Sequence, residues 1–297
     1  MVMNNDQGPV VLTTPRRRKR LQRQEEMRIS FNHGLGDALM FRAALSHVKQ
    51  HVDLVVHPGT KYAQFFEGMD NVTVRESRRQ TRGRYEIRFY PEDSDRQCVS
   101  GAKTKTRICM EHELGVFDPD IVVKPHPLNW ANKTTADVWR SLYAISRKGP
   151  KRYLVFHGQA GSSPERKDCP PWLAWHIQEV VESMGFRLIV LNYDFTHRIK
   201  SRPDYWWVGV NDSLSTKGYP TGALPMWHIL NQASEFIGVD SGPLHLALTI
   251  PRLPCVFIRN QIDFMTQFYD AGLDQIKSIL SYESSFPEVT EAIKNLP

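Results

Sequence analysis

The chain has 297 residues, of which 41% are hydrophobic and 24% charged, and these are ordinary values for a globular protein of about two domains. It is too long for a small disulfide-stapled module. No apolar run approaches the roughly 18 residues needed to cross a bilayer, so no transmembrane anchor is expected. The net charge of +6 is unevenly placed, because residues 1–28 carry +4 and residues 75–84 another +4, which leaves −2 elsewhere. Two basic patches on a mildly acidic body indicate an anionic partner or substrate; a solvated tail and loop are the alternative.

Residues 1–26 contain the basic run Arg16–Arg20 and show no hydrophobic periodicity. The run does not lead into the apolar segment that a secretion signal requires, so we expect a flexible basic tail that is disordered or loosely docked. None of the four cysteines belongs to a Cys-x-x-Cys pair, and no metal site is expected. Free thiols without an export signal predict a cytoplasmic protein.

Short β-rich runs alternate with helical patterns from residue 27 to residue 148. The first helix is predicted after Asp37, because apolar residues recur at helical spacing over 41–48. The remaining runs of this half predict strands over 28–31, 53–57, 71–74, 85–89 and 121–123, and a closing helix over 135–147.

The same alternation restarts after residues 148–151, a Lys-Gly-Pro-Lys sequence typical of a linker. Alternating strands and helices indicate parallel sheets covered on both faces. We therefore predict an α/β protein of two Rossmann-like domains, 27–148 and 149–280, which face a cleft. A C-terminal helix over 281–297 can pack back on the first domain. In the second half, strands are predicted over 153–157, 186–191, 206–208, 236–239 and 255–258.

Ligands of such sheets bind at the carboxyl ends of the strands, and three loops place small or polar residues there. The first is Gly34-Leu35-Gly36-Asp37, where glycine lets a ligand approach the backbone and Asp37 lies at the start of a helix. From this local pattern alone, an ordinary N-cap is the better explanation of Asp37. The dinucleotide fingerprint is incomplete, which weakens the hypothesis of an NAD-dependent or nucleotide-sugar-modifying enzyme.

The second loop, 162–167, combines two serines with Arg166 and Lys167 ahead of a predicted helix. It suits a diphosphate, but it also fits a polar surface loop. The third, Asp240-Ser241-Gly242-Pro243-Leu244-His245, follows a strand and is the strongest of the three signals. Its Ser-Gly step offers backbone amides at a helix start, a favourable position for phosphate, whereas His245 taken alone fits a core histidine.

Residues 240–247 resemble the signature of GT-B glycosyltransferases of the heptosyltransferase family, glycosyltransferase family 9. Residues 34–37 are similar to that family's N-terminal Gly-Asp motif, and residues 167–172 to its middle lysine motif. The three motifs occur in the family's order, and the resemblance covers about residues 27–260.

The resemblance implies a GT-B fold and an inverting sugar transfer from a nucleotide-sugar donor, without a metal ion and without a cofactor. It implies that Asp37 is the catalytic base and that Lys167 binds donor phosphate. Elementary chemistry agrees, because inversion needs one base for the acceptor proton and positive potential on the departing diphosphate. The remaining residues that it implies for donor binding are Gly36, Asp240, Ser241, Gly242 and His245.

The first half of such enzymes receives the acceptor, and both basic segments lie in this half. We therefore expect acceptor contacts from Arg75, Arg78, Arg79 and Arg82. An anionic saccharide of the lipopolysaccharide type and a modified base in phage or viral DNA fit this charge about equally, although a duplex base must be flipped out of the helix. The alternative is a non-catalytic GT-B-like module that binds nucleic acid or a protein partner, with steep salt dependence for a polyanion.

Overall fold

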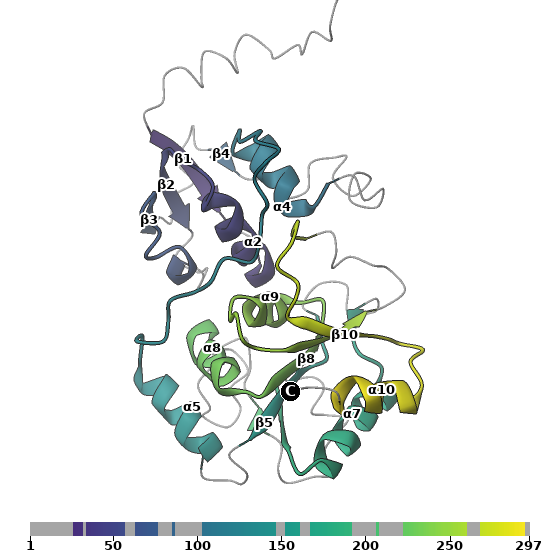
Figure 1. Ribbon diagram of the computed structural model, residues 1–297. Coiled ribbons are helices and arrows are strands. Elements are labelled where there is room, and N and C mark those ends of the chain that lie inside the picture. The colour runs from purple at the N-terminus through teal and green to yellow at the C-terminus, as the bar shows by residue number, and fades with distance from the viewer. Residues whose placement is uncertain are drawn as a thin grey trace, which may run out of the picture.

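The computed structural model describes residues 26–31, 34–56, 63–76, 85–86, 103–146, 152–160, 167–191, 206–207, 222–259 and 268–294. Within these ranges strands and helices alternate and form two separate parallel sheets, as Figure 1 shows. The prediction of an α/β protein with parallel sheets is therefore confirmed. No helix within the described ranges has the length and apolar character needed to cross a membrane.

The smaller sheet contains the first strands of the chain. Its central pair, β1 and β2, is parallel, and five of the six β2 residues are completely or almost completely buried, because helices and loops cover both faces. In the described ranges the strand order is β3 (Val72–Glu76), β2 (His51–Val56), β1 (Glu26–Phe31) and β4 (Tyr85–Glu86). The helical elements of this half are α2 (Leu35–Leu45), η1 (Ala63–Phe65), α4 (Lys105–Ile108) and the π-helical turn η2 (Cys109–Glu113).

The larger sheet is covered on both faces. In β5, Val155 points to the face covered by α8 and α9, whereas Phe156 points to the opposite face, covered by α7 and α10. In the described ranges its strand order is β10 (Ile276–Ser281), β9 (Cys255–Arg259), β8 (Glu235–Val239), β5 (Tyr153–His157), β6 (Arg187–Val190) and β7 (Trp206–Trp207). Its helices are α7 (Pro171–Ser183), α8 (Ala223–Gln232), α9 (Gly242–Leu248) and α10 (Phe286–Lys294).

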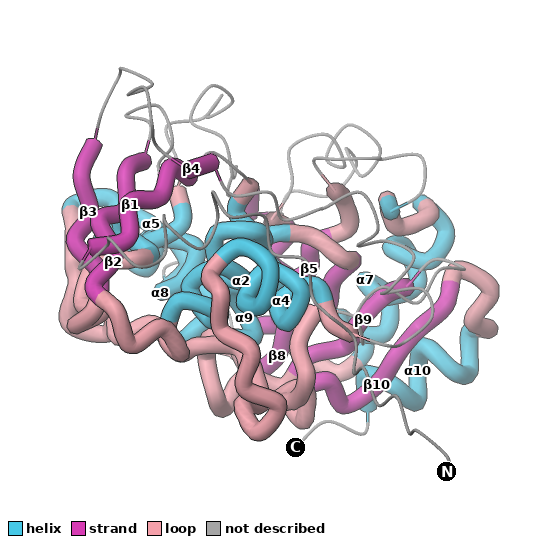
Figure 2. The backbone as a smooth tube through the Cα atoms, turned by 90° about the horizontal axis from the view of Figure 1, so that it is seen from above, coloured by secondary structure: helices cyan, strands magenta, loops and turns pink. Residues whose placement is uncertain are grey.

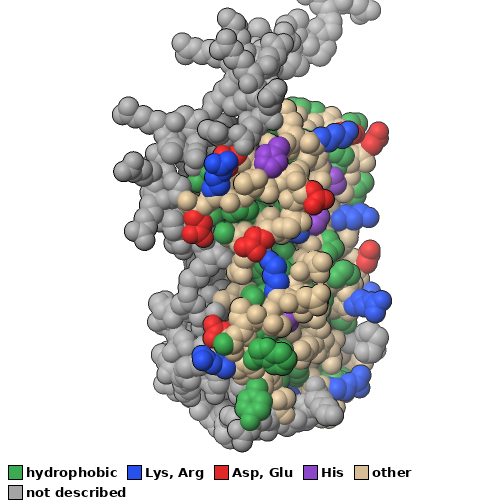
Figure 3. Space-filling view, turned by 90° about the vertical axis from the view of Figure 1, so that its left-hand side faces the viewer, with side chains coloured by type: hydrophobic (Ala, Val, Ile, Leu, Met, Phe, Trp, Pro, Cys, Tyr) green, Lys and Arg blue, Asp and Glu red, His purple; other side chains and the backbone are tan. Residues whose placement is uncertain are grey.

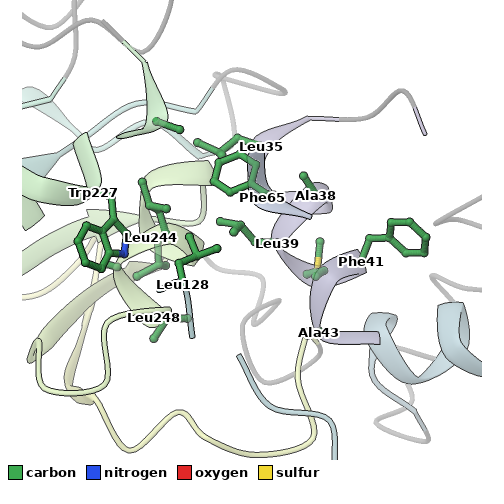
Figure 4. Close-up of a cluster of buried hydrophobic side chains, with 14 of the residues drawn as sticks. Leu35, Ala38, Leu39, Phe41, Ala43, Phe65, Leu128, Trp227, Leu244 and Leu248 are labelled. Atoms are coloured by element: carbon green, nitrogen blue, oxygen red, sulfur yellow. The ribbon is translucent and has the colours of Figure 1, made fainter. Parts of the chain in front are cut away.

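One continuous apolar core joins the two sheets through the contact of α2 with α9. Figure 4 shows Leu35 and Leu39 on the side of α2 that faces Leu244 of α9. Seen from above in Figure 2, α2 and α4 lie over α9. This contact determines where the loop after β1 lies relative to the loop after β8.

A buried arginine fastens the last turn of α2. Arg42 donates to the backbone oxygen of Phe65 in η1 and, at 3.3 Å, to that of Pro127. Its side chain is almost fully buried, and this burial lowers the pKa of Arg42 to about 10. This pKa is still well above neutrality, so Arg42 keeps its charge while its hydrogen bonds to two backbone carbonyls hold α2 in place.

Two predictions about the middle of the chain are corrected. Residues 121–123 form no strand; instead, the backbone oxygen of Val123 accepts hydrogen bonds from Asp270 and Ala271 in a distant loop. The sequence also predicts that the helix α5 (Ala136–Ser146) closes the first half, but α5 packs against α8 of the larger sheet. The predicted linker 148–151 lies outside the described residues.

The predictions for the two ends of the chain fare differently. The C-terminal helix α10 packs on α7 rather than back on the first domain, because its apolar residues Val289 and Ile293 join the core of the larger sheet. Strand β10 precedes it and was not predicted. The expected basic tail lies outside the described residues, apart from Glu26 at the start of β1.

Candidate functional site

The first turns of α2 and α9, the helices that follow β1 and β8, meet at two glycines. A Cβ atom on Gly36 would lie 2.9 Å from Cδ2 of His245, closer than such atoms approach in proteins. A Cβ atom on Gly242 would lie 2.8 Å from three side-chain carbons of Leu35. Glycine at both positions is therefore what lets α2 and α9 approach closely enough to join the first and third sequence motifs.

A partly buried ion pair lies at the carboxyl end of β8. Oδ2 of Asp240 lies 2.8 Å from Nζ of Lys167, the residue that precedes α7 by a few positions. Nε2 of His245 lies 3.7 Å from Oδ1 of the same carboxylate, beyond the length of a normal hydrogen bond. Burial alone would raise the pKa of Asp240, but the contacts with His245 and Lys167 outweigh burial and lower it to about 2. Asp240 is therefore a charged, well-held partner of Lys167 at neutral pH.

His245 is enclosed by aromatic side chains. The ring is 2% exposed, its Nδ1 lies 3.2 Å from the hydroxyl oxygen of Tyr269, and its centroid lies 4.9 Å from that of Phe268. Burial, together with the charge of Asp37, raises the pKa of Tyr269 well above its usual value, so the phenol stays protonated. The sequence did not indicate Tyr269, since no motif contains residues 268–270.

Ser241 is held from the neighbouring strand. Its hydroxyl donates to the backbone oxygen of Val239 at 3.2 Å and lies 3.0 Å from Nδ1 of His157. Burial lowers the pKa of His157 to about 3, so this ring is neutral at physiological pH. His157 is the last residue of β5. Its position at the carboxyl end of a predicted strand is therefore the feature of the sequence that could have indicated it as a site residue.

Asp37 lies in the first turn of α2 and is half-buried. Its Oδ2 accepts a hydrogen bond from the backbone N–H of Gly34 at 3.3 Å, an arrangement that stabilises the helix start. The N-cap of α2 is Gly34, so Asp37 is not the N-cap that its local pattern suggested; it lies at N3, where its carboxylate accepts from the backbone of the N-cap residue.

The expected acceptor arginines are only partly described. Arg75 is exposed on β3, and its Nε lies 2.9 Å from Oδ1 of the buried Asp53 on β2. The charge of Arg75 is therefore partly compensated within the protein. Arg78, Arg79 and Arg82 lie outside the described residues. On the face that Figure 3 shows, the described basic and acidic side chains are interspersed.

No protein-family model and no curated protein sequence matches this chain. Solved structures do match. A glycosyltransferase of family 9 from Veillonella parvula is 12% identical, with a TM-score of 0.56, over 92% of this chain and 90% of that chain. An ADP-heptose lipopolysaccharide heptosyltransferase II from E. coli is 10% identical, with a TM-score of 0.55, over 91% and 98%.

This is a heptosyltransferase-like GT-B fold. A third neighbour, the dodecameric iron-containing heptosyltransferase TibC in complex with ADP-D-beta-D-heptose, is 15% identical, with a TM-score of 0.52, over 78% of this chain and 58% of that chain. Within the described residues no three His, Cys, Asp or Glu side chains are grouped as a metal site would require. At these identities the likeness concerns the fold, and the roles of Asp37, Lys167 and the 240–245 segment remain predictions.

Proposed function

We propose that the protein transfers a sugar, with inversion, from a nucleoside-diphosphate donor to a hydroxyl group of an anionic acceptor. The observation that carries this proposal is the contact of Gly36 with His245, which joins the loop of Asp37 to the ion pair of Lys167 and Asp240. A carboxylate and a fixed cation, supplied by elements of the two sheets, are what such a reaction requires.

On the donor side, Lys167 would stabilise the negative charge that develops on the departing diphosphate. An ammonium group carries three N–H donors, so pairing with Asp240 leaves donors for an incoming phosphate. The pairing also reduces the freedom of a long side chain, so less conformational entropy is lost when the donor binds. Asp240 would thus hold Lys167 in place, and the hydroxyl of Ser241, the next residue, would turn from the backbone oxygen of Val239 to donate to the phosphate.

On the acceptor side, Asp37 would take the proton from the attacking hydroxyl group. Inversion requires this base on the face of the sugar opposite the leaving group. Asp37 comes from an element of the smaller sheet and Lys167 from one of the larger sheet, which suits such an opposite placement. We propose transfer without a metal ion, with Lys167 in the role of the cation, so activity should survive a chelator that strips bound metal.

The acceptor would be anionic, either a saccharide of the lipopolysaccharide type or DNA with a modified base. Support comes from the arginine-rich segment 75–84, of which Arg75, on β3, is described. The two acceptors differ in a measurable way, since binding to DNA weakens steeply with added salt.

The test is a thermal-shift panel of ADP-, UDP-, GDP- and CDP-sugars, because a ligand that binds only the folded state raises its melting temperature. We expect one nucleotide class to raise it, and turnover of that donor with an anionic acceptor to follow. If no nucleotide sugar binds while polyanions bind with steep salt dependence, the non-catalytic module is the correct description.

A further inference from the structure

A short segment between β9 and β10 is tied firmly to the first half of the chain. Asp270 accepts hydrogen bonds from the hydroxyl of Thr104 at 2.7 Å and from the backbone N–H of Val123 at 3.0 Å. It also pairs with the guanidinium of Arg107 at 2.8 Å. Three residues of the first half, two of them from α4 and its N-cap, thus fix one residue of a loop that belongs to the larger sheet.

The same segment is fixed at its other end. The backbone oxygen of Phe268 accepts a hydrogen bond from the hydroxyl of Thr106 and one from its backbone N–H at 3.3 Å. Tyr269 lies between these two anchored residues and is 2% exposed. Its backbone therefore has little freedom, and its side chain is presented to the site in a fixed direction.

The hydroxyl of Tyr269 faces Nδ1 of His245 at 3.2 Å, and the other ring nitrogen faces the carboxylate of Asp240 at 3.7 Å. A protonated phenol can donate to Nδ1 only if this nitrogen carries no proton. In the neutral ring the proton is then on Nε2, where it points at a negative charge. The opposite tautomer would turn a lone pair toward Asp240, which is unfavourable.

We propose that Tyr269 is a positioning residue that holds His245 as the Nε2–H tautomer and thereby supports the pair of Asp240 and Lys167. Its part in donor binding rests on the proposed function; its part in fixing the tautomer does not. Because Tyr269 is anchored to elements of the first half, the geometry of the phosphate-binding groups depends on contacts that are distant in sequence.

The test compares Tyr269→Phe with Tyr153→Phe. Both changes remove one buried phenol hydroxyl and keep the ring; that of Tyr153 donates to the backbone oxygen of Ile229 at 2.7 Å, away from His245. Nitrogen-15 NMR of the imidazole reports the tautomer of His245, and titration with ADP and with UDP reports binding. We expect wild type and Tyr153→Phe to show the Nε2–H form. Tyr269→Phe should show a mixed or reversed tautomer and about fivefold weaker binding of the nucleotide that wild type prefers.

Wild type alone already decides part of the question, even if Tyr269→Phe does not fold. An Nδ1–H tautomer of His245 in wild type would overturn the proposal, and so would an unchanged tautomer in a folded Tyr269→Phe variant. If neither ADP nor UDP binds wild type but the tautomer changes as expected, the positioning role stands and the proposed donor fails. If the tautomer changes while binding weakens equally in both variants, the link to the donor is wrong.

Discussion

The ring of His245 lies against the backbone of Gly36, with room for a hydrogen atom and not for a methyl group. The two residues are far apart in sequence, and they belong to the first and third motifs. At their contact α2, which follows β1 of the smaller sheet, meets α9, which follows β8 of the larger sheet. The proposed site depends on this close contact between Gly36 and His245, because it brings the first and third motifs together.

Gly36→Ala should therefore separate the two motifs. The added Cβ would lie 2.9 Å from the ring of His245, so the ring or α2 must move, at a cost of about 1–3 kcal/mol in the free energy of unfolding. Urea denaturation measures this cost, and donor titration should show weakened binding. Gly34→Ala is the stability control, since the nearest atom to its Cβ would be 3.7 Å away. Equal stability of the two variants would contradict the close packing.

Lys167→Met should change how stability depends on pH. The folded pKa of Asp240 is about 2 against an ordinary value of 3.8, so the ion pair contributes stability above pH 4 that is lost as the pH falls toward 2. In Lys167→Met the carboxylate remains buried without its cation. We expect the free energy of unfolding of Lys167→Met to be about 2 kcal/mol lower than that of wild type at pH 7, and this difference should shrink as the pH falls.

Urea denaturation of Lys167→Met at pH 7 and pH 3.5 gives the comparison. Lys277→Met, which removes an exposed lysine from β10, should match wild type at both values. If Lys167→Met were less stable than wild type by the same free energy of unfolding at both pH values, Lys167 would not hold Asp240 in its charged form.

Most strands of the fold could be predicted from the sequence, because apolar β-rich runs bounded by loops are a local property. The strands from β1 to β9 follow this rule, and so does the placement of Asp240 at a strand end. The run Ile121-Val122-Val123 has the same local character but forms no strand. The backbone oxygen of Val123 instead accepts hydrogen bonds from residues 270 and 271, and a long-range contact of this kind leaves no pattern in the local sequence.

The site could be predicted as three motifs but not as an arrangement. Gly36 and His245 were both candidates, yet their contact follows from the packing of α2 on α9. Tyr269 and His157 were missed for different reasons. Tyr269 is brought in by the anchors of Asp270, which lie more than 100 residues away, whereas His157 could have been found at its strand end.

Glu235→Gln should stabilise the protein at alkaline pH. Glu235 is 2% exposed at the start of β8, and burial raises its pKa to about 9. Its pKa in the folded protein lies above the ordinary 4.5, so burying this carboxyl does not reduce the free energy of unfolding below pH 4.5. As the pH rises from 4.5 toward 9, the free energy of unfolding falls by roughly 1.4 kcal/mol per pH unit.

Glutamine has no proton to lose, so Glu235→Gln and wild type should differ more at pH 8 than at pH 5. Urea midpoints at the two values measure the difference. The exposed Glu291→Gln on α10 is the control and should follow wild type. Parallel pH dependence of Glu235→Gln and wild type would show that this carboxyl is not buried.

Asp37→Asn tests the central claim most directly. The amide oxygen can still accept the hydrogen bond from Gly34, so the helix start is preserved, but the side chain can no longer take a proton. With the donor selected by the thermal-shift panel, the rate of sugar transfer should fall by at least about 100-fold, while the dissociation constant for the nucleoside diphosphate stays within about twofold. Full transfer activity in a folded Asp37→Asn variant would contradict the assignment of Asp37 as the base.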